Sequence, residues 1–339
     1  MPKINLYEQD LTTAGGLDAS SNIVYVPGFA RYINKKYSDP NSKDYIKWPH
    51  LFRSVSEFIN VFSNDKGVFE YLCYSVATIT DDNNIVRTAL NLERSMQYAL
   101  AILQSGFPVL YDVLNTPDGK GIILEETCKT SIEGITTNLK NLKDKNIYDI
   151  KFITTGGYEN ISNGLYSTML SVAAARGDCT ALIDHDDYSD YSIDKIINLR
   201  ENYANGKFGA MFTPWCVFQF PSYEKFDIAE WSNPPYLKET SMPGSLAYLL
   251  AFASSVVNNN ANWLAAAGAN RGTIPYLIAP KYNLKESEID RLQLTETNYT
   301  GTAINPIATI NPYGAIIWGN RTLHQSGTGL IASSFLNIR

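Results

Sequence analysis

The chain has 339 residues, enough for two or three domains, and 45% of them are hydrophobic, so we predict a folded protein with a sizeable core. The net charge of −6 and the lack of a lysine or arginine run argue against a nucleic-acid partner, because phosphate binding needs a concentrated positive surface. The N-terminus has no apolar signal core, and the longest weakly polar stretch, residues 244–257, is too short to span a membrane. We expect a protein made in the cytoplasm, without membrane insertion.

Aromatic residues are abundant, with 22 Tyr, 14 Phe and 5 Trp, whereas charged residues make up only 18%. Such side chains fill cores or anchor protein contacts, and both interpretations stay open for Trp215, Trp231, Trp263 and Trp318. The four cysteines are widely spaced and form no Cys-x-x-Cys pair, so we expect buried thiols in a reducing compartment rather than a zinc site: Cys73, Cys128, Cys179 and Cys216.

Residues 1–30 are predicted to be an extended N-terminal arm with a first strand. Ile4, Leu6 and Tyr7 belong to a short alternating strand, and a second strand over residues 23–26 is expected to stop at Pro27 and Gly28. The arm has too few apolar residues to fold alone. We expect a strand in it to be captured by a sheet edge of its own or a neighbouring subunit.

Residues 31–125 are predicted to form a smaller mixed α+β domain. Ser54 and Glu57 have the spacing of a capping box, with apolar residues at helical spacing behind them. A helix over 92–104 carries an apolar face and leads into a buried strand over 108–114.

Residues 126–280 are predicted to form a three-layer α/β domain. Strands alternate with helices, which indicates a parallel sheet covered on both faces: strands 150–154, 179–184 and 208–213, helices 165–176 and 193–203, and a long apolar helix over 243–257. Residues 281–339 are predicted to be β-rich. Two Asn-Pro turns there enclose a short apolar run, followed by a strand from Gly314 to Gly319.

One acidic cluster invites a chemical hypothesis. Asp184, His185, Asp186 and Asp187 follow the end of a predicted strand, where α/β sheets usually place their sites. The carboxylates of Asp184, Asp186 and Asp187 could bind Mg²⁺ or Ca²⁺ and serve a cation-dependent hydrolase, but they match no EF-hand spacing. The alternative is an acidic loop that favours the N-terminus of the following helix.

No other pattern indicates catalysis or a cofactor. Gly156 and Gly157 lie where a phosphate-binding loop would be, but they lack its further residues and are typical of a tight turn. The three histidines, His50, His185 and His324, accompany no nucleophile elbow. We therefore predict a protein that is not an enzyme, with no catalytic or cofactor-binding residues.

Several blocks, in order along the chain, resemble the sheath proteins of contractile phage tails and related injection systems. The two most specific are Ala267-Gly-Ala-Asn-Arg-Gly272 and the block from Asn311-Pro-Tyr-Gly314 to Gly319-Asn-Arg-Thr-Leu323. Five more blocks add to the resemblance: residues 48–62, 103–111, 174–184, 211–215 and 242–248.

The resemblance implies a subtilisin-like α/β domain that lacks a catalytic triad. It implies a structural subunit that stacks as hexameric rings around a tail tube and contracts to drive the tube through a host envelope. Implied partners are other copies, the tube protein, and baseplate and terminator or neck proteins, in a virion tail assembled in the host cytoplasm. Ile4, Leu6 and Tyr7 would be lent to a neighbouring sheet. Because sheath proteins usually continue beyond the block ending at Arg339, the C-terminal sheath domain looks truncated.

Overall fold

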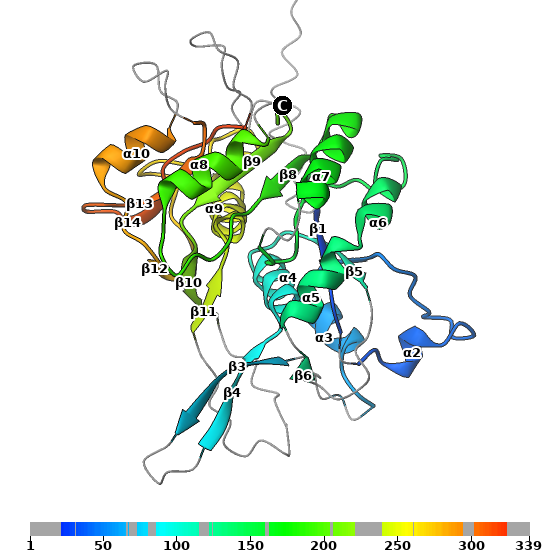
Figure 1. Cartoon of the computed structure of the whole chain (residues 1–339). Helices are drawn as coiled ribbons and strands as arrows, with labels where there is room; N and C mark the ends of the chain where they lie inside the picture. The colour runs from blue at the N-terminus through cyan, green and yellow to red at the C-terminus, as the bar shows by residue number, and fades with distance from the viewer. Residues whose placement is uncertain are drawn as a thin grey trace, which may run out of the picture.

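The computed structural model describes residues 22–30, 32–65, 67, 73–80, 86–114, 122–123, 125–159, 163–203, 206–220, 239–259, 261–293 and 302–323. An eight-stranded sheet forms its centre, in the order β14-β13-β9-β8-β7-β1-β5-β2 (Figure 1). The strands are β1 Val24–Gly28, β2 His50–Phe52, β5 Val109–Val113, β7 Phe152–Ile153, β8 Thr180–Ile183, β9 Gly209–Thr213, β13 Asn305–Ile310 and β14 Gly314–Ile317. Every pairing from β5 through β13 is parallel, and only the edge strands β2 and β14 pair antiparallel. The predicted α/β class with a mostly parallel sheet is confirmed.

Strand β1 is longer than predicted. It lies inside the sheet between β7 and β5 and is fully buried. It also runs through Pro27 and Gly28, which pair with Asp112 and Val113 of β5. The carbonyl oxygen of Tyr25 accepts a hydrogen bond from the N–H of Thr154, so the backbone groups of Tyr25 point toward β7. Those of Pro27, two residues further along the strand, point the same way. Because β7 ends at Ile153, the missing N–H of Pro27 costs no ladder hydrogen bond.

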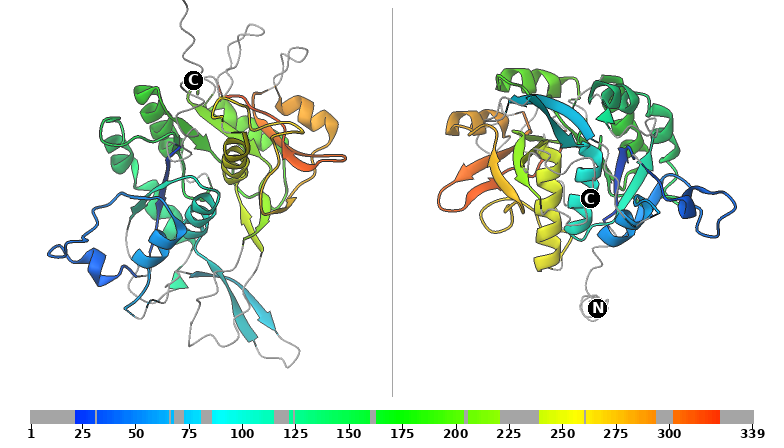
Figure 2. Two further views of the ribbon diagram at one scale, coloured as in Figure 1. Left: turned by 180° about the vertical axis from the view of Figure 1, so that it is seen from behind. Right: turned by 90° about the horizontal axis from the view of Figure 1, so that it is seen from below.

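Helices cover both faces of the sheet, as predicted. On one face lie α4 (Arg94–Gln104) and α9 (Gly244–Asn259), which pack on each other and on β1 and β9. On the other face lie α7 (Asn163–Arg176), which packs on β8, and α8 (Ile193–Glu201) (Figure 2).

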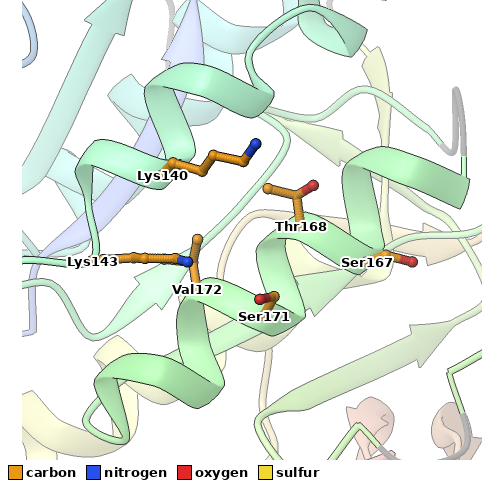
Figure 3. Close-up of a pocket in the computed structure, with 6 residues that line it drawn as sticks. All are labelled: Lys140, Lys143, Ser167, Thr168, Ser171 and Val172. Atoms are coloured by element: carbon orange, nitrogen blue, oxygen red, sulfur yellow. The ribbon is translucent and has the colours of Figure 1, made fainter.

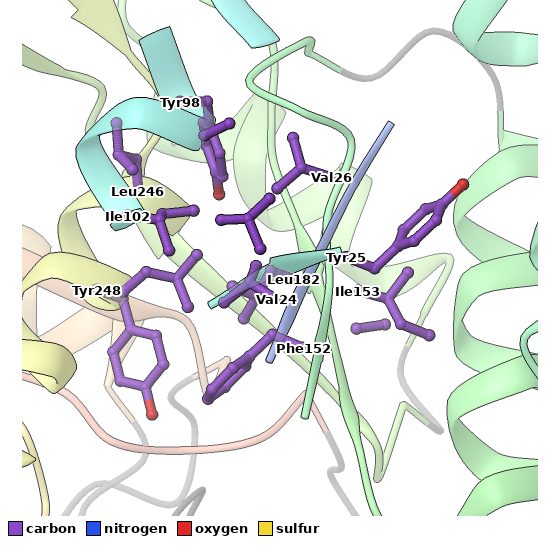
Figure 4. Close-up of a cluster of buried hydrophobic side chains, with 14 of the residues drawn as sticks. Val24, Tyr25, Val26, Tyr98, Ile102, Phe152, Ile153, Leu182, Leu246 and Tyr248 are labelled. Atoms are coloured by element: carbon purple, nitrogen blue, oxygen red, sulfur yellow. The ribbon is translucent and has the colours of Figure 1, made fainter. Parts of the chain in front are cut away.

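The apolar core follows from strand alternation. Val24 and Val26 point toward α4 and α9, where they meet Tyr98, Ile102, Leu246 and Tyr248, whereas Tyr25 and Ile153 point to the opposite face (Figure 4). All of these side chains are buried, and the core is continuous from the sheet into both helices.

Shorter helices fill the connections. They are α2 (Lys35–Ser38), α3 (Val55–Val61), α5 (Glu125–Glu133), α6 (Thr136–Asn141) and α10 (Glu286–Leu292). The predicted capping box starts α3: Ser54 Oγ accepts from the N–H of Glu57 at 3.2 Å, and the Glu57 carboxylate accepts from the N–H of Arg53 at 2.8 Å.

Two three-stranded sheets flank the large one. One has the order β11-β10-β12, formed by Glu239–Met242, Cys216–Gln219 and Leu277–Pro280. The other joins β3 (Cys73–Thr80), β4 (Val86–Leu92) and β6 (Ile122–Ile123), and its β3–β4 hairpin projects away from the body at the bottom of Figure 1.

The large sheet takes strands from all four predicted ranges. Strand β1 comes from 1–30, β2 and β5 from 31–125, β7 to β9 from 126–280, and β13 and β14 from 281–339. The division stays a prediction: all four ranges contribute to the large sheet, while each small sheet lies within a single range.

The C-terminal block contains one turn rather than two. Asn311 and Pro312 lie in the turn that joins β13 to β14, as expected, but Asn305 and Pro306 begin β13 itself. The side chain of Asn305 is buried and bonds the backbone of Met211 and Arg321, so this residue joins β9, β13 and the segment after β14.

Candidate functional site

The sheet places its candidate site at the carboxyl ends of the parallel strands. Strand order reverses at β1: the chain moves from β1 to β5 on one side, then to β7, β8 and β9 on the other. Open α/β sheets bind ligands in the crevice at such a reversal. The residues that follow β1, β7 and β8 therefore decide what this edge can do.

A buried carboxylate of the chain itself occupies the reversal point. Glu93 caps α4 and accepts hydrogen bonds from the N–H groups of Ser95 at 2.8 Å and Met96 at 3.0 Å, from Ser95 Oγ at 2.6 Å, and from the Tyr158 hydroxyl. Burial raises the pKa of this carboxyl, and the hydrogen bonds oppose that effect. The anion position at the helix N-terminus, which could hold a phosphate in other α/β proteins, is thus filled by an internal side chain.

The glycine pair after β7 closes the same crevice. Gly156 and Gly157 form a turn in which both φ angles are positive, +69° and +92°. A Cβ at Gly156 would lie 2.2 Å from the carbonyl oxygen of Pro27, so the turn packs directly on the end of β1. This is the tight turn that the sequence predicted.

Asp184 points into the core rather than toward solvent. It is 1% exposed, and its carboxylate accepts from Ser245 N at 3.2 Å and from Ser245 Oγ at 2.6 Å. Burial raises its pKa to about 7, while the bonds from Ser245 lower it. Asp184 therefore joins β8 to the first turn of α9.

His185 is held as a neutral, fully bonded side chain. Its Nδ1 lies 2.7 Å from the carbonyl oxygen of Asp186, which can only accept, so Nδ1 carries the proton. Nε2 then accepts from Thr213 Oγ1 at 2.8 Å, and the Tyr191 hydroxyl donates to that oxygen at 2.8 Å. Burial lowers the histidine pKa to about 4. An imidazole fixed in this way is not placed as a general base.

The acidic cluster does not converge on one point. Asp187 turns to Lys281, whose Nζ lies 2.7 Å from both carboxylate oxygens, while Asp184 binds Ser245 on the other side of the loop. Within the described residues, no three His, Cys, Asp or Glu side chains are grouped as metal ligands. The geometry does not support the cation-dependent hydrolase.

The remaining predicted residues have structural surroundings where they are described. Cys128, Cys179 and Cys216 are buried free thiols, and burial raises the pKa of Cys179 to about 12. His50 lies 3.6 Å from Glu57 at the start of α3, far along the chain from His185. The arm residues Ile4, Leu6 and Tyr7, together with His324 and Trp231, lie outside the described residues.

The tryptophans divide between the two interpretations. Trp215 is buried, and its Nε1 donates to the carbonyl of His185 at 2.7 Å. Trp263 and Trp318 are 62% and 37% exposed.

Sequence reasoning missed Glu93. The usual N-cap residues are Ser, Thr, Asn, Asp and Gly, so a glutamate before an apolar helical run is a weak capping signal. In the described part of the chain, no helix is both long enough and apolar enough to cross a membrane.

No protein-family model matches the sequence, and no curated protein matches it. Solved structures do match. The sheath complex of an extracellular contractile injection system, PVC, in the contracted state aligns over 100% of this chain and 70% of its own, with a TM-score of 0.51 and 15% identity. The chain has the fold of a contractile sheath protein. This confirms at the level of fold the resemblance that the sequence blocks indicated.

Two assemblies of the anti-feeding prophage, AFP, are similar at slightly lower scores. Its contracted helical sheath aligns over 96% of this chain and 68% of its own, with 12% identity and a TM-score of 0.48. A chain of its contracted baseplate aligns over 100% and 71%, with 16% identity and a TM-score of 0.49.

Proposed function

We propose that this chain is the structural subunit of a contractile tail sheath. The observation that carries the proposal is the match of the whole chain to a sheath subunit fold, in a structure described as contracted. The filled N-termini of α4 and α9 agree with it, because Glu93 and Asp184 occupy positions where an anionic substrate or cofactor could otherwise bind.

In the proposed assembly, subunits form hexameric rings that stack around a tail tube and contract to drive the tube through a host envelope. The work of contraction would come from exchanging one set of subunit contacts for a more stable one. Baseplate and terminator or neck proteins would bound the stack, and the complete assembly would be the tail of a virion or a related injection particle.

Connections between rings would be kept by strand addition. Ile4, Leu6 and Tyr7 are our candidates for a strand lent to a neighbouring sheet, because backbone hydrogen bonds can hold a tether while the folded bodies rotate. We further propose that the α/β core corresponds to the subtilisin-like domain of sheath proteins.

Immunogold electron microscopy tests the proposal on native material. Antibodies raised against the purified chain are applied to tail-like particles isolated from the cells that produce it. We expect gold along the whole length of the shaft. Gold confined to one end, or absent from the particles while the chain remains in the unassembled fraction, would contradict a sheath role.

A further inference from the structure

The β3–β4–β6 sheet projects from the body and is joined to it through two helices. Strand β4 ends at Leu92, and the next residue, Glu93, is already the cap of α4; β6 ends at Ile123, with one residue between it and α5. Within the described residues, the three strands pack mainly on one another, and the hairpin points away from the large sheet (Figure 1). The direction in which this sheet projects therefore depends on how the starts of α4 and α5 are held.

The segment after β7 holds the start of α4. The Tyr158 hydroxyl donates to the Glu93 carboxylate, and Nη1 of Arg94 donates to Oε2 of Glu159 at 2.7 Å. The guanidinium of Arg94 also lies 5.2 Å from the centre of the Trp215 ring. Two adjacent residues of one loop thus bind the two residues that directly follow β4.

Glu159 binds α5 as well. Its Oε1 accepts from Nζ of Lys129, so one carboxylate bridges a cation on each of the two junction helices. The side chains of Arg94, Lys129 and Glu159 are 11%, 22% and 12% exposed, so solvent screens their charges little. Burial raises the pKa of Glu159, but the two cations outweigh burial and hold the pKa below its usual value. We call these three residues the Glu159 clamp.

Asp186 is a fourth charged group beside the clamp. Burial raises its pKa, the negative charge of Glu159 raises it further, and Lys129 opposes both effects. Two cations thus face two carboxylates. Without the charge of Glu159, Arg94 and Lys129 would keep Asp186 alone as a counter-charge in a largely buried place, and their repulsion would push the starts of α4 and α5 apart.

We propose that Glu159 is a positioning residue that fixes the direction of the β3–β4–β6 sheet. It holds together the two helices that directly follow β4 and β6, so that both strands meet the body at a set angle. A projecting sheet can touch only what lies in its direction, so the clamp also determines where the hairpin can make contacts. This role belongs to the single chain and does not depend on the proposed assembly.

Distances between spin labels, measured by pulsed electron paramagnetic resonance, test this role. One label is attached at Thr88→Cys in β4, and the other at Ser171→Cys on α7, an exposed position beside a surface groove (Figure 3). Cys73→Ser removes the thiol in β3, and the remaining native thiols are buried. We expect one narrow distance distribution in the chain with an intact clamp.

Two clamp variants should broaden this distribution roughly twofold, because a buried ion pair that loses one partner leaves an uncompensated charge. Glu159→Gln preserves the size of the side chain and removes its charge. Lys129→Met releases α5 alone and leaves the pair of Arg94 and Glu159 intact, so it tests the same role if the first variant does not fold. Circular dichroism identifies the folded variants.

Two controls separate positioning from a general loss of stability. Asp187→Asn breaks a partly buried ion pair with Lys281, which lies outside both junction helices, and should leave the sheet distance unchanged. A second label pair, Ser171→Cys with Asn258→Cys on α9, reports on the body and should give the same distance in every variant.

An unchanged sheet distance in a folded clamp variant would overturn the proposal. Equal broadening in the control variant, or between the two labels on the body, would overturn it as well, because the change would then reflect loosening of the whole fold.

Discussion

Asp184 and His185 are adjacent, fully buried and bonded to different partners. Ionising either side chain opposes folding, but Asp184 becomes charged as the pH rises and His185 becomes charged as the pH falls. Asp184 has a raised pKa, about 7 in the folded chain against an ordinary 3.8, and therefore holds a proton there that the unfolded chain has released. His185 has a lowered pKa, about 4 against 6.5, and therefore lacks a proton that the unfolded chain has bound. Between pH 4 and 6.5 the two effects oppose each other.

The first prediction separates them. The native chain loses stability from Asp184 as the pH rises from about 4 to 7, and Asp184→Asn removes this loss. The free energy of unfolding of the variant, relative to that of the native chain, should therefore increase over that window by up to about 4 kcal/mol. Urea denaturation at several pH values measures this difference. His185→Gln should give a relative stability that decreases with pH between 4 and 6.5. A relative stability that is independent of pH in both variants would show that neither group titrates as described.

The second prediction concerns the closed crevice at the end of β1. A Cβ at Gly28 would lie 2.2 Å from Ser95 Oγ and 2.3 Å from the Tyr111 hydroxyl, inside the network around Glu93. Gly28→Ala should therefore destabilise the fold by about 2–3 kcal/mol, measured by urea denaturation. Gly134→Ala is the control, because its Cβ would lie 3.3 Å from the carbonyl oxygen of Ser131, a tight contact but no overlap, and it should cost much less than Gly28→Ala. A harmless Gly28→Ala would mean that the crevice is open.

At the scale of elements, the sequence predicts the long helices and the central strands about equally well. Strands β5, β8 and β9 lie within one residue of their predicted bounds. The apolar patterns of α7, α8 and α9 predicted their positions within about two residues, because a long helix averages its signal over several turns. Strand β1 continues two residues past its predicted end, because Pro27 and Gly28 look like a stop. The sheet tolerates a proline there only because the neighbouring strand β7 ends at Ile153, which depends on the tertiary structure.

The β3–β4 hairpin was not predicted, although a signal was available. An Asp-Asp-Asn-Asn run precedes a stretch in which apolar or β-branched residues alternate with others, at Val86, Thr88, Leu90 and Leu92, which is typical of a strand after a turn.

For the candidate site, the sequence correctly located the acidic loop at the end of β8. It could not show that Asp184 turns inward to Ser245 while Asp187 turns to Lys281, because partners 61 and 94 residues away are a product of the fold.

The third prediction addresses how the segment after β14 is held to the sheet. Asn305 bonds both the N–H and the carbonyl of Arg321, at 2.6 and 2.8 Å, and the N–H of Leu323 donates to Gly209 at 2.8 Å. Asn305→Ala should cost about 2–3 kcal/mol of unfolding free energy and speed hydrogen exchange at residues 321–323. Asn283→Ala removes one exposed bond to Thr309 and should change little. Unaltered exchange at 321–323 in Asn305→Ala would refute this role.

On the scale of the whole molecule, the buried charged side chains and hydrogen bonds of the described residues hold the sheet and its helices together as a rigid body. The helix N-termini of α4 and α9 are filled by Glu93 and Asp184, and the core runs unbroken through sheet and helices. A rigid body suits a sheath subunit, because the proposed work depends on exchanging contacts between subunits and not on deforming each one.

The most direct test of this account is electron microscopy of the purified chain at high concentration, with sedimentation on the same sample. We expect rings or hollow tubes with a central channel wide enough for an inner tube, assembled without nucleotide or metal. A chain that sediments as a monomer and hydrolyses a substrate through the Asp184–Asp187 loop, with activity lost on replacing those acids by Asn, would contradict the account.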